Sequence, residues 1–238
     1  MNVGHSIVDG CKLTVLRNQK LLTLQENNNT FTLEASLPLY TITSDIGYVN
    51  LELLKSSDIP DMMEKVKNCK ALIFDLRNYP IQFDSWELIS YISLTKNYQY
   101  AMKTLPDLSH LGVFHCYELH TNCPDELWLK NCKYQGKIVV LINASTMSWA
   151  ETRAMSFRIN GATLVGTPTA GANGIVVRFS LPGGVSVGYS GMGFYYPNGE
   201  QMQRNGIIPD IEVYPTMDDI LAGRDEVLEA AIRYVNSN

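Results

Sequence analysis

The sequence predicts an α/β protein built from successive βαβ units, and three observations support this. Continuous apolar runs at residues 71–77 and 137–142 have the composition of strands buried on both faces of a parallel sheet. Helical patterns at residues 57–69, 84–94 and 148–159 lie between and after these runs. Strand and helix alternate along most of the chain, which is typical of a sheet flanked by helices.

The N-terminal part is the least regular. Short β-like runs at residues 13–16, 21–24 and 31–33 are separated by turn-rich pieces such as QENNNT. We therefore expect residues 1–46 to form a small β-rich appendage, or the remainder of a truncated upstream domain. Residues 47–238 are expected to form the α/β domain.

The first βαβ unit begins with the strand GYVNLELL at Gly47. Pro60 suits the first turn of the helix that follows, and ALIFDLR is the next buried strand. Asp75 and Arg77 are expected to fix the end of this strand through a salt bridge or backbone contacts. The aromatic-rich segment 95–135 has little periodicity, and we expect it to cover the site as a cap or insertion.

The most informative stretch is KIVVLINASTMSWAETRAM, residues 137–155. A wholly apolar strand runs into a serine-bearing turn and then a helix from about Ser148, which Gly161 ends before the strand 162–166. A serine at such a junction lies beside free N–H groups at the positive end of a helix, where an oxyanion can be held. The pattern therefore indicates acyl transfer by Ser148.

Ser148 also has a structural interpretation. Ser148 and Glu151 have the S-x-x-E spacing of a capping box, in which each side chain binds the other residue's backbone N–H. On spacing alone, capping is the commoner explanation.

The C-terminal third begins with the glycine-rich loop 166–174, followed by a hairpin (GIVVRFSLPGGVSVGYS) and helices at 218–221 and 224–235. The loop lacks the glycine and lysine spacing of phosphate-binding motifs. Its glycines are expected to allow a turn close to the active serine. The hairpin offers an edge for an extended peptide, although a plain hairpin explains it equally well.

Composition excludes several classes. The chain has 238 residues, 45% hydrophobic and 18% charged, with a formal charge of -5, which argues against a nucleic-acid partner. No segment is long and apolar enough to span a membrane, and the start lacks the pattern of a signal peptide. Five cysteines without paired spacing, and histidines 110, 115 and 120 in the middle segment, imply neither a disulfide framework nor a metal site. No metal or organic cofactor is expected.

Five ordered motifs carry a family resemblance. They are GYVNLELL, ALIFDLRNYP, KIVVLINASTMSWAE, ATLVGTPTAGANG and FYYPNGEQMQRNGIIPDIEV. In these motifs the chain resembles the tail-specific, or C-terminal processing, serine peptidases, and within them the branch near the tricorn protease core. The resemblance implies a ClpP/crotonase-like spiral of βαβ units and a serine peptidase acting on peptide or protein substrates. It gives the nucleophile role to Ser148 rather than Ser145, and the family is usually periplasmic or secreted.

The chain departs from the family at the base. Most members use a lysine in the glycine-rich loop, but this sequence has no lysine after Lys137. The tricorn-like branch pairs its serine with an upstream histidine in a G-H sequence, which His5 matches. Gln203 stands where that branch has a glutamate, and a glutamine would stabilise an imidazolium less than a carboxylate does.

The resemblance also implies an oxyanion hole. Its donors would be the Trp149 N–H and an N–H from the loop near Ile81, with Gly171 contributing to substrate binding from the glycine-rich loop. The alternative from another class is a peptide- or lipid-binding module that kept the fold and lost catalysis. An acyl-CoA enzyme of the crotonase type is a weaker third hypothesis, because fold alone does not assign function.

Overall fold

The computed structural model describes residues 12–17, 20–25, 40–43, 45–81, 85–93, 95–131 and 133–237. The chain divides into two compact units, Met1–Ser36 and Leu37–Asn238. In the first unit, β1 (Lys12–Arg17) and β2 (Lys20–Gln25) form an antiparallel hairpin, as the runs at 13–16 and 21–24 predict. The expected run at 31–33 and His5 lie outside the described residues.

The second unit begins upstream of Gly47, where the sequence suggests the boundary. The reason is β3 (Tyr40–Thr43), which pairs antiparallel with β4 (Ile46–Asn50) and so extends the main sheet by one edge strand.

The main sheet has six strands in the order β13-β9-β8-β5-β4-β3. The remaining four strands are β5 (Ala71–Asp75), β8 (Lys137–Ile142), β9 (Thr163–Gly166) and β13 (Ile211–Glu212). Every neighbouring pair except β3 and β4 is parallel. The predicted α/β class with βαβ units is therefore confirmed.

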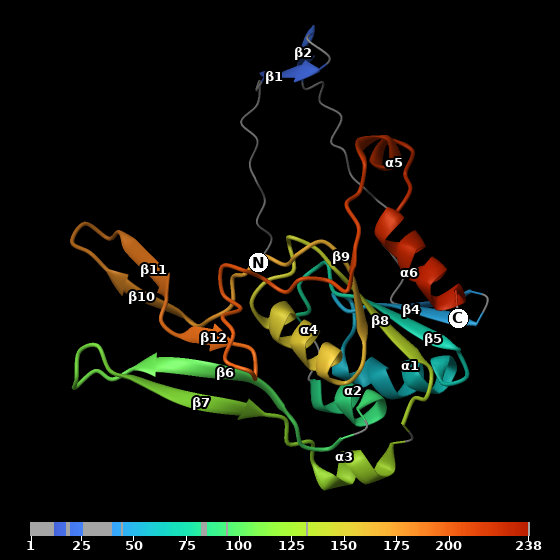
Figure 1. Ribbon diagram of the computed structural model, residues 1–238, viewed down its shortest axis with the longest axis horizontal. Helices are drawn as coiled ribbons and strands as arrows, with labels where there is room; N and C mark the ends of the chain where they lie inside the picture. Colours follow the sequence, from blue (N-terminus) through green and yellow to red (C-terminus); the bar gives the residue numbers. More distant parts are fainter. Residues whose placement is uncertain are drawn as a thin grey trace. The chain divides into compact units, whose positions relative to one another are not determined.

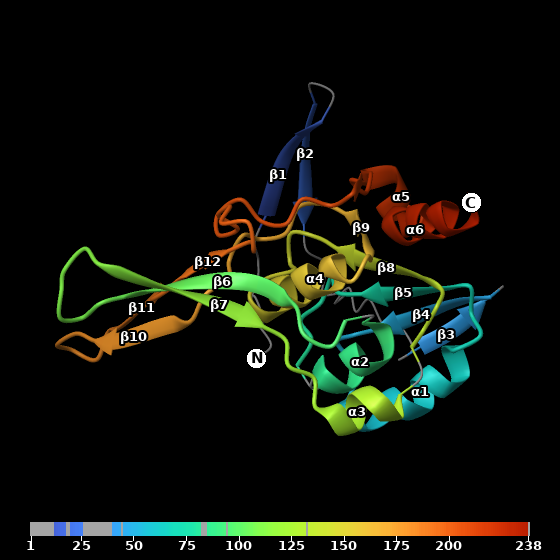
Figure 2. The same cartoon turned by 60° about the horizontal axis from the view of Figure 1, so that its bottom comes forward.

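Helices cover both faces of this sheet, because side chains on β5 and β8 alternate between two cores. Leu72 and Val140 face one core, which includes α1 (Ile59–Val66), α2 (Ser85–Ile92) and α4 (Trp149–Ile159). Ile73 and Leu141 face the other core, formed with α6 (Glu226–Asn236). Figure 2 shows α6 on the opposite side of the sheet from α1 and α2.

Segment 95–135 forms β6 (Gln99–Pro106), β7 (Phe114–His120) and α3 (Asp125–Lys130). β6 lies between β7 and β12 (Gly193–Tyr195) in a separate antiparallel sheet. The long β6–β7 arm extends away from the helical layers alongside the hairpin of β10 (Val176–Ser180) and β11 (Ser186–Ser190) (Figure 1). The short elements η1 (Ser56–Asp58) and α5 (Met217–Leu221) complete the described structure.

No helix within the described ranges combines the length and the apolar character needed to cross a bilayer.

Candidate active site

Ser148 follows a tight turn at the end of β8. The fully buried Thr146 fixes this turn: its hydroxyl accepts the Asn143 N–H at 3.0 Å and donates to the Leu76 carbonyl at 3.0 Å. The turn is thereby tied to the segment that follows β5. As a result, the loop beyond Leu76 and the turn before Ser148 leave the sheet at the same edge.

The backbone of Ser148 is strained. Its φ of 52° and ψ of -117° lie outside the regions that non-glycine residues ordinarily occupy. Such a conformation costs of order 1–3 kcal/mol and is typical of active-site residues. A strained serine between a buried strand and a helix is also the arrangement of a nucleophile elbow, which presents the hydroxyl at the edge of the sheet.

The capping interpretation of Ser148 is met in part. Ser148 and Glu151 have the reciprocal arrangement of a capping box, but only one of its two contacts has regular hydrogen-bond geometry: the Ser148 N–H donates to Glu151 Oε2 at 3.1 Å. The other contact, between the Ser148 side chain and the Glu151 backbone N–H, is present but does not meet that geometry. The Ser148 hydroxyl therefore faces the start of α4 without a regular hydrogen bond to it.

Glu151 connects α4 to the glycine-rich loop. Its fully buried carboxylate also accepts the Thr169 hydroxyl at 2.6 Å, the Gly171 N–H at 2.8 Å and the Ala172 N–H at 3.1 Å. Burial raises the pKa of the Glu151 carboxyl, while these hydrogen bonds and that from Ser148 act in the opposite direction. One carboxylate thus holds the loop against the start of the helix.

The glycine-rich loop passes beside Ser148, as the sequence predicts. The Ala172 carbonyl accepts the Ser148 N–H at 3.1 Å, and the Thr146 carbonyl accepts the Ala170 N–H at 3.0 Å. Gly171 has a φ of +63°, and a Cβ there would meet the backbone of Arg204 at 2.9 Å. Because the Gly171 N–H binds Glu151, Gly171 can line a substrate site but does not offer that N–H to a ligand.

The Trp149 N–H is the available donor at the start of α4. No acceptor in the described part of the chain binds it, as expected for the first residue of a helix. The Trp149 ring is half-exposed and stacks over Arg153 at 3.8 Å. Ile81 is 64% exposed in the loop after β5, but residues 82–84 lie outside the described ranges.

Gln203 is held by backbone groups. Its Oε1 accepts the Phe194 N–H at 3.1 Å, while its Nε2 donates to the carbonyls of Met192, at 2.9 Å, and Asn173. These bonds join β12 to the end of the glycine-rich loop. Gln203 therefore has a structural role irrespective of any contact with a histidine.

The described histidines lie on or next to the β6–β7 arm and bind local carboxylates. His110 and His115 contact Asp107 at 3.1 and 3.2 Å, and His120 contacts Glu118 at 2.9 Å. None of them, and no lysine in the described ranges, hydrogen-bonds to Ser148. No cluster of metal-binding side chains is found among the described residues.

A cavity of about 510 Å³ opens beside the glycine-rich loop. Gly171, Ala172 and Asn173 form one wall, and Gln203 and Arg204 lie beside them. Because Ala172 also binds the Ser148 N–H, the cavity begins next to the candidate nucleophile.

Asp75 and Arg77 form the predicted salt bridge. The Arg77 guanidinium donates to Asp75 Oδ2 at 2.6 Å and to Asp225 Oδ2 at 2.7 Å, and the Tyr48 hydroxyl donates to Asp75 at 2.8 Å. Asp225 is the N-cap of α6, so the network joins the end of β5 to this helix. This role is structural.

Sequence reasoning did not assign Thr146 or Thr169. Thr169 is nearly buried, donates to Glu151 and accepts the Ile207 N–H at 2.7 Å. In the sequence, Thr169 is only a threonine within a glycine-rich loop. No local pattern pairs it with Glu151, because the contact spans eighteen positions.

The chain belongs to peptidase family S41. The family's model matches residues 82–213, which is more than half of the chain. This match confirms the family predicted from the five motifs.

Solved structures show the same fold. A protein of Parabacteroides merdae ATCC 43184, proposed to be a peptidase, has a TM-score of 0.68 at 24% identity, over 82% of this chain and 63% of that one. Mature CPAF complexed with lactacystin has a TM-score of 0.60 at 16% identity, over 81% of this chain and 52% of that one. The photosystem II D1 C-terminal processing protease has a TM-score of 0.50 at 17% identity, over 71% of this chain and 42% of that one. The ClpP/crotonase-like α/β fold is thereby confirmed.

The chain spans less than two thirds of the length of these proteins. At these identities the likeness concerns the fold. No curated protein matches the chain.

Proposed function

We propose that the protein is a serine peptidase in which Ser148 is the nucleophile. The strained backbone of Ser148 at the junction of β8 and α4 carries this proposal. Strain of this kind persists only where surrounding contacts enforce it, and here the buried Thr146 and Glu151 do so. Membership of peptidase family S41 supports peptide or protein substrates.

In the proposed reaction, Ser148 Oγ attacks the carbonyl carbon of a peptide bond and His5 takes the hydroxyl proton. The C–N bond then breaks, and the imidazolium returns the proton to the leaving amine. Water hydrolyses the acyl-enzyme by the same sequence of proton transfers. The Trp149 N–H and an N–H near Ile81 would stabilise the oxyanion in both steps.

Gln203 would hold the imidazole in place. Its Oε1 already accepts the Phe194 N–H, but a carbonyl oxygen has a second lone pair that could accept an imidazole N–H. A neutral amide stabilises the imidazolium less than a carboxylate would, so we expect turnover to be slow.

The second candidate is a peptide-binding protein without catalysis. It is favoured by the hydrogen bonds that fix Gln203 to the backbone and by the lack of a histidine or lysine bonded to Ser148 among the described residues. On this hypothesis the cavity beside the glycine-rich loop would bind a peptide without cleaving it.

Substitution of the nucleophile separates the two candidates. We expect Ser148→Ala to abolish hydrolysis of fluorogenic peptides and labelling by a fluorophosphonate probe. Ser145→Ala is the matched control, because Ser145 is exposed in the same turn and its hydroxyl bonds to no residue within the described ranges; its backbone N–H donates to Asn143. Equal labelling of the parent and the Ser148→Ala variant would remove this mechanism.

A further inference from the structure

The β10–β11 hairpin has one apolar and one polar face. Val177 lies opposite Tyr189 and Phe179 opposite Val187, and the alternation continues to Leu181 and Val185 next to the turn. The opposite face carries Arg178 and the serines at both ends of the register. The pattern is that of a sheet whose apolar face is covered.

Much of this face is exposed in the described structure. Phe179 is 48% exposed, Val185 56% and Tyr189 54%, and the rings of Phe179 and Tyr189 pack edge to face at 6.4 Å. These exposed apolar side chains share one face, so they are a candidate surface for binding an apolar ligand.

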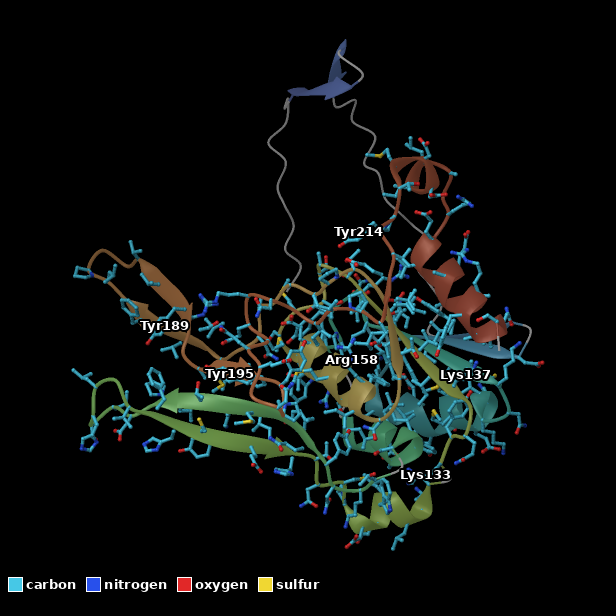
Figure 3. All side chains as sticks on the ribbon, in the orientation of Figure 1. Lys133, Lys137, Arg158, Tyr189, Tyr195 and Tyr214 are labelled. Carbon is cyan, nitrogen blue, oxygen red and sulfur yellow. The ribbon has the colours of Figure 1, made fainter. Side chains whose placement is uncertain are left out.

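The apolar face leads into the cavity beside the glycine-rich loop. Tyr189 lines that cavity together with Phe114 and Pro106 of the β6–β7 arm, and Gly171 and Ala172 of the glycine-rich loop line it as well. In Figure 3, Tyr189 is labelled on this hairpin and Tyr195, which lines the same cavity, on β12. A ligand on the hairpin can therefore continue to the segment that contacts Ser148.

The dimensions of the face fit one extended chain. Val177 and Leu181 are four positions apart, which corresponds to about 13 Å along a strand, and two strands with their side chains are about 10 Å wide. The footprint is thus of order 130 Å². A stable dimer buries roughly 800 Å² on each partner, so this face alone is several-fold too small to hold two copies together.

The charge of the cavity disfavours a basic occupant. Arg204 is the single charged side chain among the residues that line it, and the other polar groups there are amides, hydroxyls and backbone groups. A lysine or arginine in the bound segment would meet this guanidinium without a carboxylate partner.

From these observations we propose that the apolar face of the β10–β11 hairpin binds an extended apolar segment of the polypeptide substrate that lacks lysine and arginine, and directs it into the cavity. The hairpin then selects substrates by a segment remote from the scissile bond. This role rests on the proposed peptidase function, but the binding itself does not require catalysis.

Binding is measured on the Ser148→Ala protein, so the result is independent of turnover. The probe is a short fluorescein-labelled peptide in which leucine and phenylalanine alternate with serine, followed by fluorescence anisotropy. A peptide with serine in place of leucine and phenylalanine is the negative control. We expect Phe179→Ser/Val185→Ser to weaken binding at least about tenfold, which corresponds to 1.4 kcal/mol.

Val176→Ser is the matched control variant. Val176 is 54% exposed on the same strand but faces the polar side, so its substitution is expected to leave binding within about twofold. Because the substituted residues are exposed, circular dichroism should show unchanged folding for all variants.

Two results would overturn the proposal. One is equal affinity of the double variant and its parent for the apolar peptide. The other is a change from dimer to monomer in the double variant, by light scattering, without a change in peptide affinity, since the face would then join two copies. Loss of peptide binding with no effect of Ser148→Ala on hydrolysis would instead support the binding surface and contradict the proposed nucleophile.

Discussion

Glu151 is a buried carboxylate that joins two segments distant in the sequence. Its oxygens accept one N–H from the start of α4 and two from the glycine-rich loop, besides the Thr169 hydroxyl. The sequence predicts the first of these bonds, because the S-x-x-E spacing is local. The others depend on how β9 returns the chain to the same edge of the sheet.

We predict that Glu151→Gln destabilises the protein by roughly 2–5 kcal/mol. The glutamine amide would face N–H donors instead of accepting from them, and each buried donor left without an acceptor costs about 1–3 kcal/mol. Urea unfolding followed by tryptophan fluorescence measures the loss. The partly exposed Glu229→Gln should change stability by less than about 0.5 kcal/mol, and equal effects of the two substitutions would contradict the role assigned to Glu151.

At the scale of elements, apolar runs predict β5 and β8, and helical patterns predict the helices that follow them. Both strands are buried on two faces, so their sequences are continuous and apolar. β7 could not be predicted in this way, because six of its seven residues are exposed and no face alternates. The pairing of β6 with β12 joins segments about ninety residues apart, and no local pattern encodes it.

The candidate site follows the same division. Ser148 could be assigned from the junction of an apolar strand with a helix. The positive φ of Ser148 and the backbone bonds of Gln203 could not, because they arise from contacts with the loops at Leu76, Asn173 and Met192.

Asp225 provides a test of how α6 is attached to the sheet. It accepts the Leu228 N–H at 3.0 Å as the N-cap and binds Arg77 through both oxygens. Asn can replace the cap but not the charge, whereas Ala replaces neither. We predict that both variants are less stable than the parent. The free energy of unfolding should be about 1 kcal/mol lower for Asp225→Ala than for Asp225→Asn.

The pH dependence of Asp225→Asn has a defined sign. Burial alone would raise the pKa of the Asp225 carboxyl, but the hydrogen bond from Arg77 outweighs burial and lowers this pKa below its ordinary value of 3.8. Between the pKa in the folded protein and the ordinary value, the unfolded chain binds more protons than the folded one. The stabilisation that the ionised Asp225 carboxylate provides is therefore present above pH 3.8 and is lost as the pH falls through the lowered pKa. The difference in unfolding free energy between the parent and Asp225→Asn should therefore shrink below about pH 4. A difference that grows on acidification would be inconsistent with this attachment.

At the scale of the whole molecule, both hydrophobic cores and all six strands of the main sheet lie within Leu37–Asn238. The residues that shape the turn at Ser148 also lie there. We therefore expect a chain that begins at Leu37 to fold by itself, with a thermal transition close to that of the full chain. The proposed base, His5, belongs to the other unit.

This division predicts that folding and hydrolysis can be separated. If His5 is the base, the chain beginning at Leu37 should retain circular dichroism and peptide binding but hydrolyse peptides about 10²- to 10⁴-fold more slowly, the contribution of a general base. His5→Ala in the full chain should show the same loss. His120→Ala should keep full activity, because His120 is exposed and contacts Glu118. Hydrolysis at the parent rate by the shortened chain would show that another group accepts the proton from Ser148, while the role of Ser148 would stand.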